Sequence, residues 1–149
     1  MAKFTKELVY RILDANINRA AEGMRVCEEV VRFILNDRRL TAKLRKMRHA
    51  IFRIFDPKSR EKFLKKRSSR RDVGRLLHGG RGRANYQDVF FANMQRVKES
   101  IRVLEEFYKL LDIKAVNKLK KIRYHVYEVE KKAAFEFSAL SGIRQRRLP

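Results

Sequence analysis

Two segments of this sequence place asparagine and arginine at matching positions. Residues 15–29 read ANINRAAEGMRVCEE and residues 92–106 read ANMQRVKESIRVLEE, with eight of the fifteen aligned positions identical. Chance would leave about one identity, so the chain contains an internal repeat. Asn16 and Arg19 in the first half therefore have Asn93 and Arg96 as counterparts in the second. Guanidinium groups bind phosphate oxygens in pairs and amides orient a ligand, so this pattern indicates a site for a phosphorylated molecule.

A second arginine pair follows further along each half. The stretch LRKMRH (44–49) aligns with LKKIRY (119–124), so that Arg48 matches Arg123. At 100° per residue on a helix, these arginines and the Asn/Arg pairs fall inside apolar arcs. We therefore expect six polar side chains to point toward the seam between helices, namely Asn16, Arg19, Arg48, Asn93, Arg96 and Arg123.

Buried arginines need an anion beside them, because an unpaired buried ion costs several kcal/mol. One compensation is internal: Glu22, Glu29, Glu99 and Glu106 lie at the helix edges and are placed to pair across the seam. The other is a ligand that carries phosphate. The two asparagines favour the ligand, since amides supply hydrogen-bond recognition rather than charge balance.

The stretch between the two halves, residues 56–86, is basic and partly irregular. It contains SSRRDVG (68–74), where Arg70 and Asp72 are placed to close over phosphate groups, and several glycines that suit a mobile lid. The pattern is not the phosphate-binding motif GxxxxGK[ST], and no strand precedes it. A flexible linker is the alternative interpretation.

The elements that must position these residues are helices. Breakers are rare, and the apolar spacing predicts helices from after Thr5 to about Leu35, over about 39–55, 87–111 and 114–139, with a short helix at 59–66. The fold class is therefore all-α. We expect one domain of residues 1–149, built from two duplicated helical hairpins (about 8–55 and 87–139) that pair as an antiparallel four-helix bundle joined by the connector.

The amino-acid composition indicates which classes of molecule the protein binds. The chain has 38 Lys+Arg against 17 Asp+Glu, a formal net charge of +21, which attracts phosphorylated molecules or nucleic acid. No segment is long and apolar enough to span a membrane, and no secretory signal is evident. The single cysteine, Cys27, suits a cytoplasmic protein and lies on an apolar helical stripe, so we expect it in the core.

Five segments together resemble a small family of hydroxymethylpyrimidine-phosphate kinases of thiamine biosynthesis. They read RILDANINRAAEGMRVCEEVVRFILND, LRKMRHAI, SRRDVG, ANMQRVKESIRVLEE and KKIRYHVYEVEK, and span about residues 8–132. Members of this family occur alone or fused ahead of thiamine-phosphate synthase, and we expect the standalone form here. The connector departs from the family pattern: relatives read close to DTPGDVGT, whereas this chain has SSRRDVGRLLHGGRG.

The resemblance implies a phosphotransferase that uses ATP and Mg²⁺ to convert hydroxymethylpyrimidine phosphate to the diphosphate. Such chemistry needs positioning and charge neutralisation rather than a covalent nucleophile. We expect Arg19 and Arg96 to act in catalysis with Asp72, a candidate Mg²⁺ contact. The duplication would give either two pseudo-equivalent pockets or one shared pocket with diverged halves, and we favour the shared pocket because a kinase must hold two phosphorylated molecules close together. The other residues expected to bind substrate or phosphate are Asn16, Asn93, Arg48, Arg123, Arg70, Glu22 and Glu99.

Two other functions fit parts of the sequence. A basic helical module that binds nucleic acid explains the net charge, and it would carry its cations on an exposed face or loop. An oligomerisation bundle, in which the seam polar groups set the register, is the third interpretation, and a homo-oligomer is compatible with each of the three.

Overall fold

The computed structural model describes residues 6–77 and 79–145 and contains only helices and loops in these ranges. The all-α prediction is therefore confirmed. In chain order the elements are α1 (Lys6–Val30), a π-helical turn (Val31–Leu35), α2 (Arg38–Ile54), α3 (Pro57–Lys66), a 3-10 turn (Ser69–Arg71), α4 (Tyr86–Tyr108) and α5 (Ile113–Gln145). Thr5, where the first helix was expected to begin, lies outside the described residues.

Local signals explain where the first helices end and begin. Asn36 adopts a left-handed conformation with φ of 53°, a geometry that asparagine tolerates and that ends the first helix. Asp37 then caps α2 by accepting a hydrogen bond from the Leu40 amide at 2.9 Å. Asp56 caps α3 in the same way through the Ser59 amide at 2.8 Å. Pro57 occupies the first position of α3, where its missing N–H is harmless.

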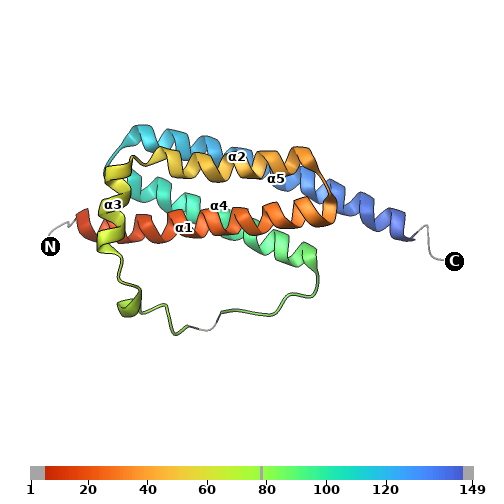
Figure 1. Ribbon diagram of the computed structural model, residues 1–149, viewed down its shortest axis with the longest axis horizontal. Coiled ribbons are helices and arrows are strands. Elements are labelled where there is room, and N and C mark those ends of the chain that lie inside the picture. Colours follow the sequence, from red (N-terminus) through yellow and green to blue (C-terminus); the bar gives the residue numbers. More distant parts are fainter. Residues whose placement is uncertain (1–5, 78, 146–149) are drawn as a thin grey trace.

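The four long helices form two layers (Figure 1), with α1 beside α4 in one and α2 beside α5 in the other. The core between them contains fully buried Leu13, Met24, Leu44, Met94 and Leu119. Because α2 ends at one end of the bundle and α4 begins at the other, the connector after α3 runs along the length of the molecule.

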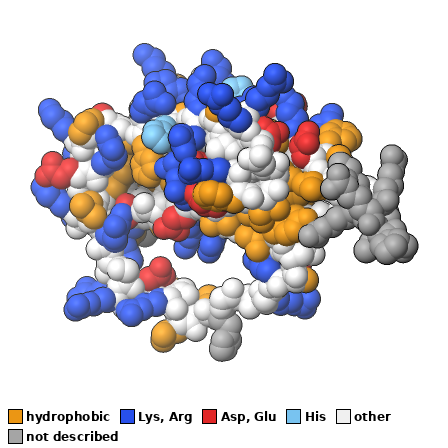
Figure 2. Space-filling model, turned by 45° about the vertical axis from the view of Figure 1, so that its right-hand side comes forward, with side chains coloured by type: hydrophobic (Ala, Val, Ile, Leu, Met, Phe, Trp, Pro, Cys, Tyr) orange, Lys and Arg blue, Asp and Glu red, His pale blue; other side chains and the backbone are white. Residues whose placement is uncertain are grey.

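The connector stands away from the bundle over much of its course, and an opening separates them in the space-filling view (Figure 2). Val73, Leu76 and Leu77 are 95%, 89% and 76% exposed, which is unusual for three large aliphatic side chains within five residues. The described part of the second half differs. There, α5 continues straight to Gln145, whereas Asp56 and Pro57 separate α2 from α3 in the first half.

Gly23 lies where α1 and α4 approach most closely. A Cβ at this position would lie 2.8 Å from Cγ2 of Val97 and 3.1 Å from the backbone oxygen of Asn93. Gly23 therefore allows the close packing of α1 against α4.

Replacing Gly23 by alanine is expected to lower the free energy of unfolding by about 1–3 kcal/mol, because the α4 backbone cannot yield locally. Urea unfolding followed by circular dichroism measures the change. Gly142→Ala in α5 is the matched control, since a Cβ there meets nothing within 4 Å. The control gains helix propensity of up to about 1 kcal/mol, and equal stabilisation of both variants would contradict the close contact.

Candidate functional site

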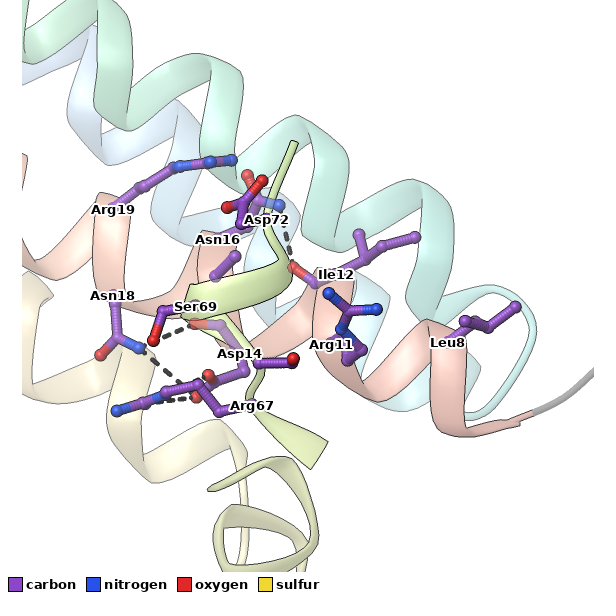
Figure 3. Close-up of a pocket in the computed structure, with 12 residues that line it drawn as sticks. Leu8, Arg11, Ile12, Asp14, Asn16, Asn18, Arg19, Arg67, Ser69 and Asp72 are labelled. Atoms are coloured by element: carbon purple, nitrogen blue, oxygen red, sulfur yellow. Dashed lines mark hydrogen bonds and ion pairs between the residues drawn. The ribbon is translucent and has the colours of Figure 1, made fainter. Parts of the chain in front are cut away.

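A pocket of about 590 Å³ lies between the first half of α1 and the segment that follows α3 (Figure 3). Helix α1 contributes one face and residues 67–72 form the opposite wall. Its lining residues are Leu8, Arg11, Ile12, Asp14, Ala15, Asn16, Asn18, Arg19, Arg67, Ser68, Ser69 and Asp72.

An ion pair holds the two walls together. The Arg67 guanidinium donates to both carboxylate oxygens of Asp14, with Nε–Oδ2 at 2.6 Å and Nη2–Oδ1 at 2.7 Å. Asn18 braces Asp14 from the next turn, where its Nδ2 donates to the Asp14 backbone oxygen at 2.9 Å. The hydrogen bond to Asp14 raises the pKa of Arg67, so the pairing favours the charged guanidinium. This pair fixes the start of the connector against α1.

Asn16 is the most buried polar side chain that faces this pocket, with 6% of it exposed. Its Nδ2 donates to the Ile12 backbone oxygen at 2.9 Å. Among the described residues its Oδ1 accepts no hydrogen bond, so this oxygen is available to a ligand that carries an N–H donor. A buried amide with one free acceptor can orient a heteroaromatic ring.

Charged groups of both signs surround Asn16. Arg11 and Arg19 line the pocket and are exposed, so their guanidinium groups are free to turn toward an anion. Asp72 accepts a hydrogen bond from the Gly74 amide through Oδ1 at 2.9 Å, which leaves its second oxygen open. Two exposed arginines next to one carboxylate are groups whose chemistry suits phosphate oxygens and a cation.

The structure brings three of the predicted site residues together, from two separate segments: Asn16, Arg19 and Asp72. The others lie outside this pocket, namely Arg48, Arg70, Asn93, Arg96, Arg123, Glu22 and Glu99. Sequence reasoning missed Arg11, Asp14 and Arg67. Of these, only Arg67 had a detectable signal, because it is the first residue of the basic stretch RSSRRD.

The expectation of one shared pocket does not fit the arrangement of α1 and α4. Gly23 lies against the Asn93 backbone and Cys27 donates its S–H to the Phe90 oxygen at 3.4 Å, so the two helices run antiparallel. Asn93 is therefore level with Gly23, seven residues and about 10 Å along α1 from Asn16. The antiparallel pairing separates the two Asn/Arg sets instead of joining them.

The prediction that four arginines converge on the seam is also wrong. Arg19 and Arg96 are exposed. Arg48 and Arg123 are largely buried, with 19% and 13% of their side chains exposed, but each has its own internal partner. These partners are Glu28 and Glu105, rather than Glu22, Glu29, Glu99 or Glu106.

The two buried ion pairs occupy equivalent positions of the repeat but differ in how the carboxylate is shared. Arg48 donates from Nε and Nη2 to Glu28 Oε2 at 3.2 and 3.1 Å, and Arg45 donates to Oε1 at 3.1 Å. Arg123 contacts both oxygens of Glu105, with Nη2–Oε2 at 3.2 Å. The internal ion-pair explanation therefore accounts for these two arginines.

On a helical wheel, Glu28 lies opposite the main apolar stripe of α1, on the same side as Glu22 and Arg25. In the bundle α1 packs against both α4 and α2, so the side of α1 that carries Glu28 is also covered. Glu28 and Glu105 occupy the same position of the repeat. Glu28 precedes Arg48 by 20 residues, and Glu105 precedes Arg123 by 18 residues. This repeated spacing of glutamate and arginine was the sequence signal that could have indicated the two ion pairs.

Burial and hydrogen bonding act in opposite directions on Glu28. Burial alone would raise the pKa of its carboxyl, but the hydrogen bonds from Arg45 and Arg48 outweigh it, and the pKa lies below its ordinary value of 4.5. Glu28 is therefore ionised at neutral pH although its side chain is fully buried.

A family model matches residues 11–132, which is most of the chain. The chain belongs to the ThiD2 family. The segments that carried the resemblance to hydroxymethylpyrimidine-phosphate kinases lie largely within the matched range, and the pocket residues Asn16, Arg19 and Asp72 lie inside it.

Curated relatives of this ThiD2 chain bear the name thiamine-phosphate synthase. One from Nostoc punctiforme is 39% identical over 127 residues, which cover 84% of this chain and 35% of the relative. Others come from Rhodopirellula baltica (34% identical, 99% and 40% covered) and Synechocystis sp. (37% identical, 87% and 37% covered). The chain thus spans little more than a third of the length of these relatives. No solved structure is significantly similar to it.

Two kinds of feature are absent from the described residues. None of the described helices combines the length and the apolar character that crossing a bilayer requires. Within the described ranges there is also no cluster of three or more His, Cys, Asp or Glu side chains that would hold a metal ion unaided.

Proposed function

We propose that this ThiD2 chain phosphorylates hydroxymethylpyrimidine phosphate, transferring the γ-phosphoryl group of ATP to a phosphate oxygen of the substrate and releasing ADP. The observation that carries the proposal is the pocket in which Asn16, Arg19 and Asp72 meet. The relatives named thiamine-phosphate synthase support a place in thiamine biosynthesis. The kinase step itself follows from the resemblance of the five sequence segments to kinases of that pathway.

Each pocket group has a role that matches its surroundings. The free Oδ1 of Asn16 accepts a hydrogen bond from the amino group of the pyrimidine. Arg19 and Arg11 bind phosphate oxygens and offset the negative charge that spreads over them during transfer. Arg67 is a positioning residue, because its hydrogen bonds go to Asp14 and hold the connector in place.

The protein would supply only some of the ligands of a magnesium ion at this site. Mg²⁺ is commonly held by one or two carboxylates together with substrate phosphates, so the absence of a larger acidic cluster among the described residues is compatible with it. Asp72 is the residue that would hold it, since both oxygens of Asp14 are engaged by Arg67. The ion would neutralise phosphate charge.

The exposed aliphatic side chains of the connector support a closing motion. Val73, Leu76 and Leu77 lie within the five residues after Asp72, and their side chains are exposed to solvent. Folding of this segment over an occupied pocket would bury them against the pyrimidine ring and exclude water from the phosphates.

The proposal is tested by incubating the purified chain with Mg-ATP and hydroxymethylpyrimidine phosphate, and by following the diphosphate and ADP by chromatography and mass spectrometry. We expect equal amounts of the two products. Controls without substrate and without protein measure background ATP hydrolysis. A folded protein, verified by circular dichroism, that forms no diphosphate above these controls would refute the kinase assignment.

A further inference from the structure

Within the four long helices of the bundle, the positive charge is concentrated in one layer, although α3 and the connector are also basic. Helix α2 carries seven Lys and Arg and no Asp or Glu, and α5 carries eight against three. In contrast, α1 and α4 together carry seven Lys and Arg against nine Asp and Glu. The residues that give the net charge of +21 are therefore unevenly distributed over the surface.

Most cations of the α2/α5 layer lack a carboxylate partner. The paired exceptions are Arg45, Arg48 and Arg123, which contact the two buried glutamates. The remaining cations of this layer with described side chains are exposed, and no described carboxylate lies within salt-bridge distance of them: Arg38, Arg39, Lys43, Lys46, Arg53, Lys114, Lys118, Lys120, Lys121, Lys131 and Lys132. Figure 2 shows Lys and Arg side chains along the top of the molecule, where this layer lies.

The two helices repel each other where their cations meet. Lys43 of α2 lies beside Lys132 of α5, and the hydrogen-bond contact and charge of Lys132 lower the pKa of Lys43. Like charges held this close destabilise the compact chain unless an anion lies between them. A polyanion laid along the layer would remove this cost.

Two hollows on the same layer combine cations with aromatic rings. One, of about 470 Å³, is lined by Arg48, His49, Phe52 and Arg53 on α2. The other, of about 690 Å³, lies on α5 and is lined by Asn117, Lys120, Lys121, Tyr124 and His125. The two hollows share one aligned position of the repeat, His49 in the first and Tyr124 in the second.

Tyr124 is the group best placed to contact a base. Its side chain is 55% exposed, and the Arg123 guanidinium lies 5.4 Å from the ring centroid and supports the ring from within the layer. Proteins that bind single-stranded nucleic acid combine such stacking surfaces with lysines that follow the phosphates.

We infer that the outward face of α2 and α5 binds single-stranded nucleic acid, with phosphates on the unpaired lysines and arginines and a base stacked on Tyr124. This surface is separate from the pocket between α1 and the connector, since none of the residues lining either hollow also lines that pocket. The inference is therefore independent of the kinase proposal.

The test uses fluorescence anisotropy of a labelled oligouridylate of about 20 nucleotides, titrated with the full chain from about 50 to 200 mM KCl. Saturable binding that weakens steeply with salt is expected. Lys120→Gln combined with Lys121→Gln should reduce the slope of log affinity against log salt by about 1.4, which corresponds to two phosphate contacts. Tyr124→Ala should weaken binding about 5- to 100-fold and leave that slope unchanged.

Arg60→Gln combined with Lys62→Gln in α3 is the matched control, because it removes the same charge from exposed side chains outside the layer. Circular dichroism verifies that all variants fold, and the kinase assay should give wild-type turnover for each. The inference is overturned if the wild-type chain does not bind at the lowest salt, or if the α3 control loses as much slope as the α5 variant. Binding to phosphatidylserine vesicles without binding to the oligonucleotide would also overturn it and identify a membrane surface as the partner.

Discussion

Replacing Glu28 by glutamine is expected to lower the free energy of unfolding at neutral pH by about 3 kcal/mol. The substitution keeps the size of the side chain but leaves the largely buried guanidinium of Arg48 without its counter-charge, and breaking one partner of a buried pair is strongly destabilising. Glu105→Gln should have a similar effect through Arg123. Urea unfolding at constant pH measures both.

The difference between wild type and Glu28→Gln should depend on pH in a defined direction. Because the pKa of Glu28 is lower in the folded chain than its ordinary value of 4.5, the ionised carboxylate favours the folded state. This stabilisation is complete above pH 4.5 and is lost as the pH falls through the folded-state pKa. The two unfolding free energies should therefore converge in the acid range.

Glu106→Gln is the control for this experiment, because Glu106 is an exposed neighbour of Glu105 with only surface ion pairs. It should leave the unfolding transition nearly unchanged. If Glu28→Gln and Glu106→Gln behave alike, the buried ion pair does not contribute to stability in the way its geometry indicates.

Replacing Arg19 by alanine is expected to reduce phosphorylation of hydroxymethylpyrimidine phosphate by about 10²- to 10³-fold in kcat/KM, the usual cost of removing one charge-stabilising donor. The same change at Arg96, its counterpart in the repeat, should leave turnover close to wild type, because Arg96 does not line the pocket. Initial rates with saturating Mg-ATP and varied substrate measure the pair.

Comparing the Arg19 and Arg96 variants distinguishes loss of turnover in Arg19 alone, in both variants, or in neither. Both side chains are exposed, so both variants should keep the unfolding free energy within about 0.5 kcal/mol of wild type. Equal loss of turnover in both would mean that the halves contribute to one site after all. Unchanged turnover in both would refute the role of Arg19 and leave membership of the ThiD2 family intact.

Much of the fold could be predicted from local patterns. The scarcity of proline and glycine and the apolar spacing predict helices at the right places, and Asn36–Asp37 and Asp56–Pro57 mark the ends of helices by their own backbone chemistry. The core position of Cys27 also follows from the apolar stripe on which it lies. These features depend on residues that are near one another in the chain.

The candidate site depended on packing that helical periodicity does not describe. A helical wheel identifies which residues share a face, but not how many faces are covered, so it does not reveal that Glu28 is buried. It also carries no information on the direction of α4 relative to α1, which separates Asn93 from Asn16.

The sequence by itself determined the helices, their caps, the internal repeat and the family. Only the tertiary structure decided that Arg48 and Arg123 belong to internal ion pairs, that Asp14 and Arg67 hold the connector against α1, and that most unpaired cations of the bundle lie on the layer of α2 and α5. The physical reason is that helix formation depends on neighbours within a few residues, whereas charge pairing and pocket formation depend on distances between segments that meet only when the bundle is packed.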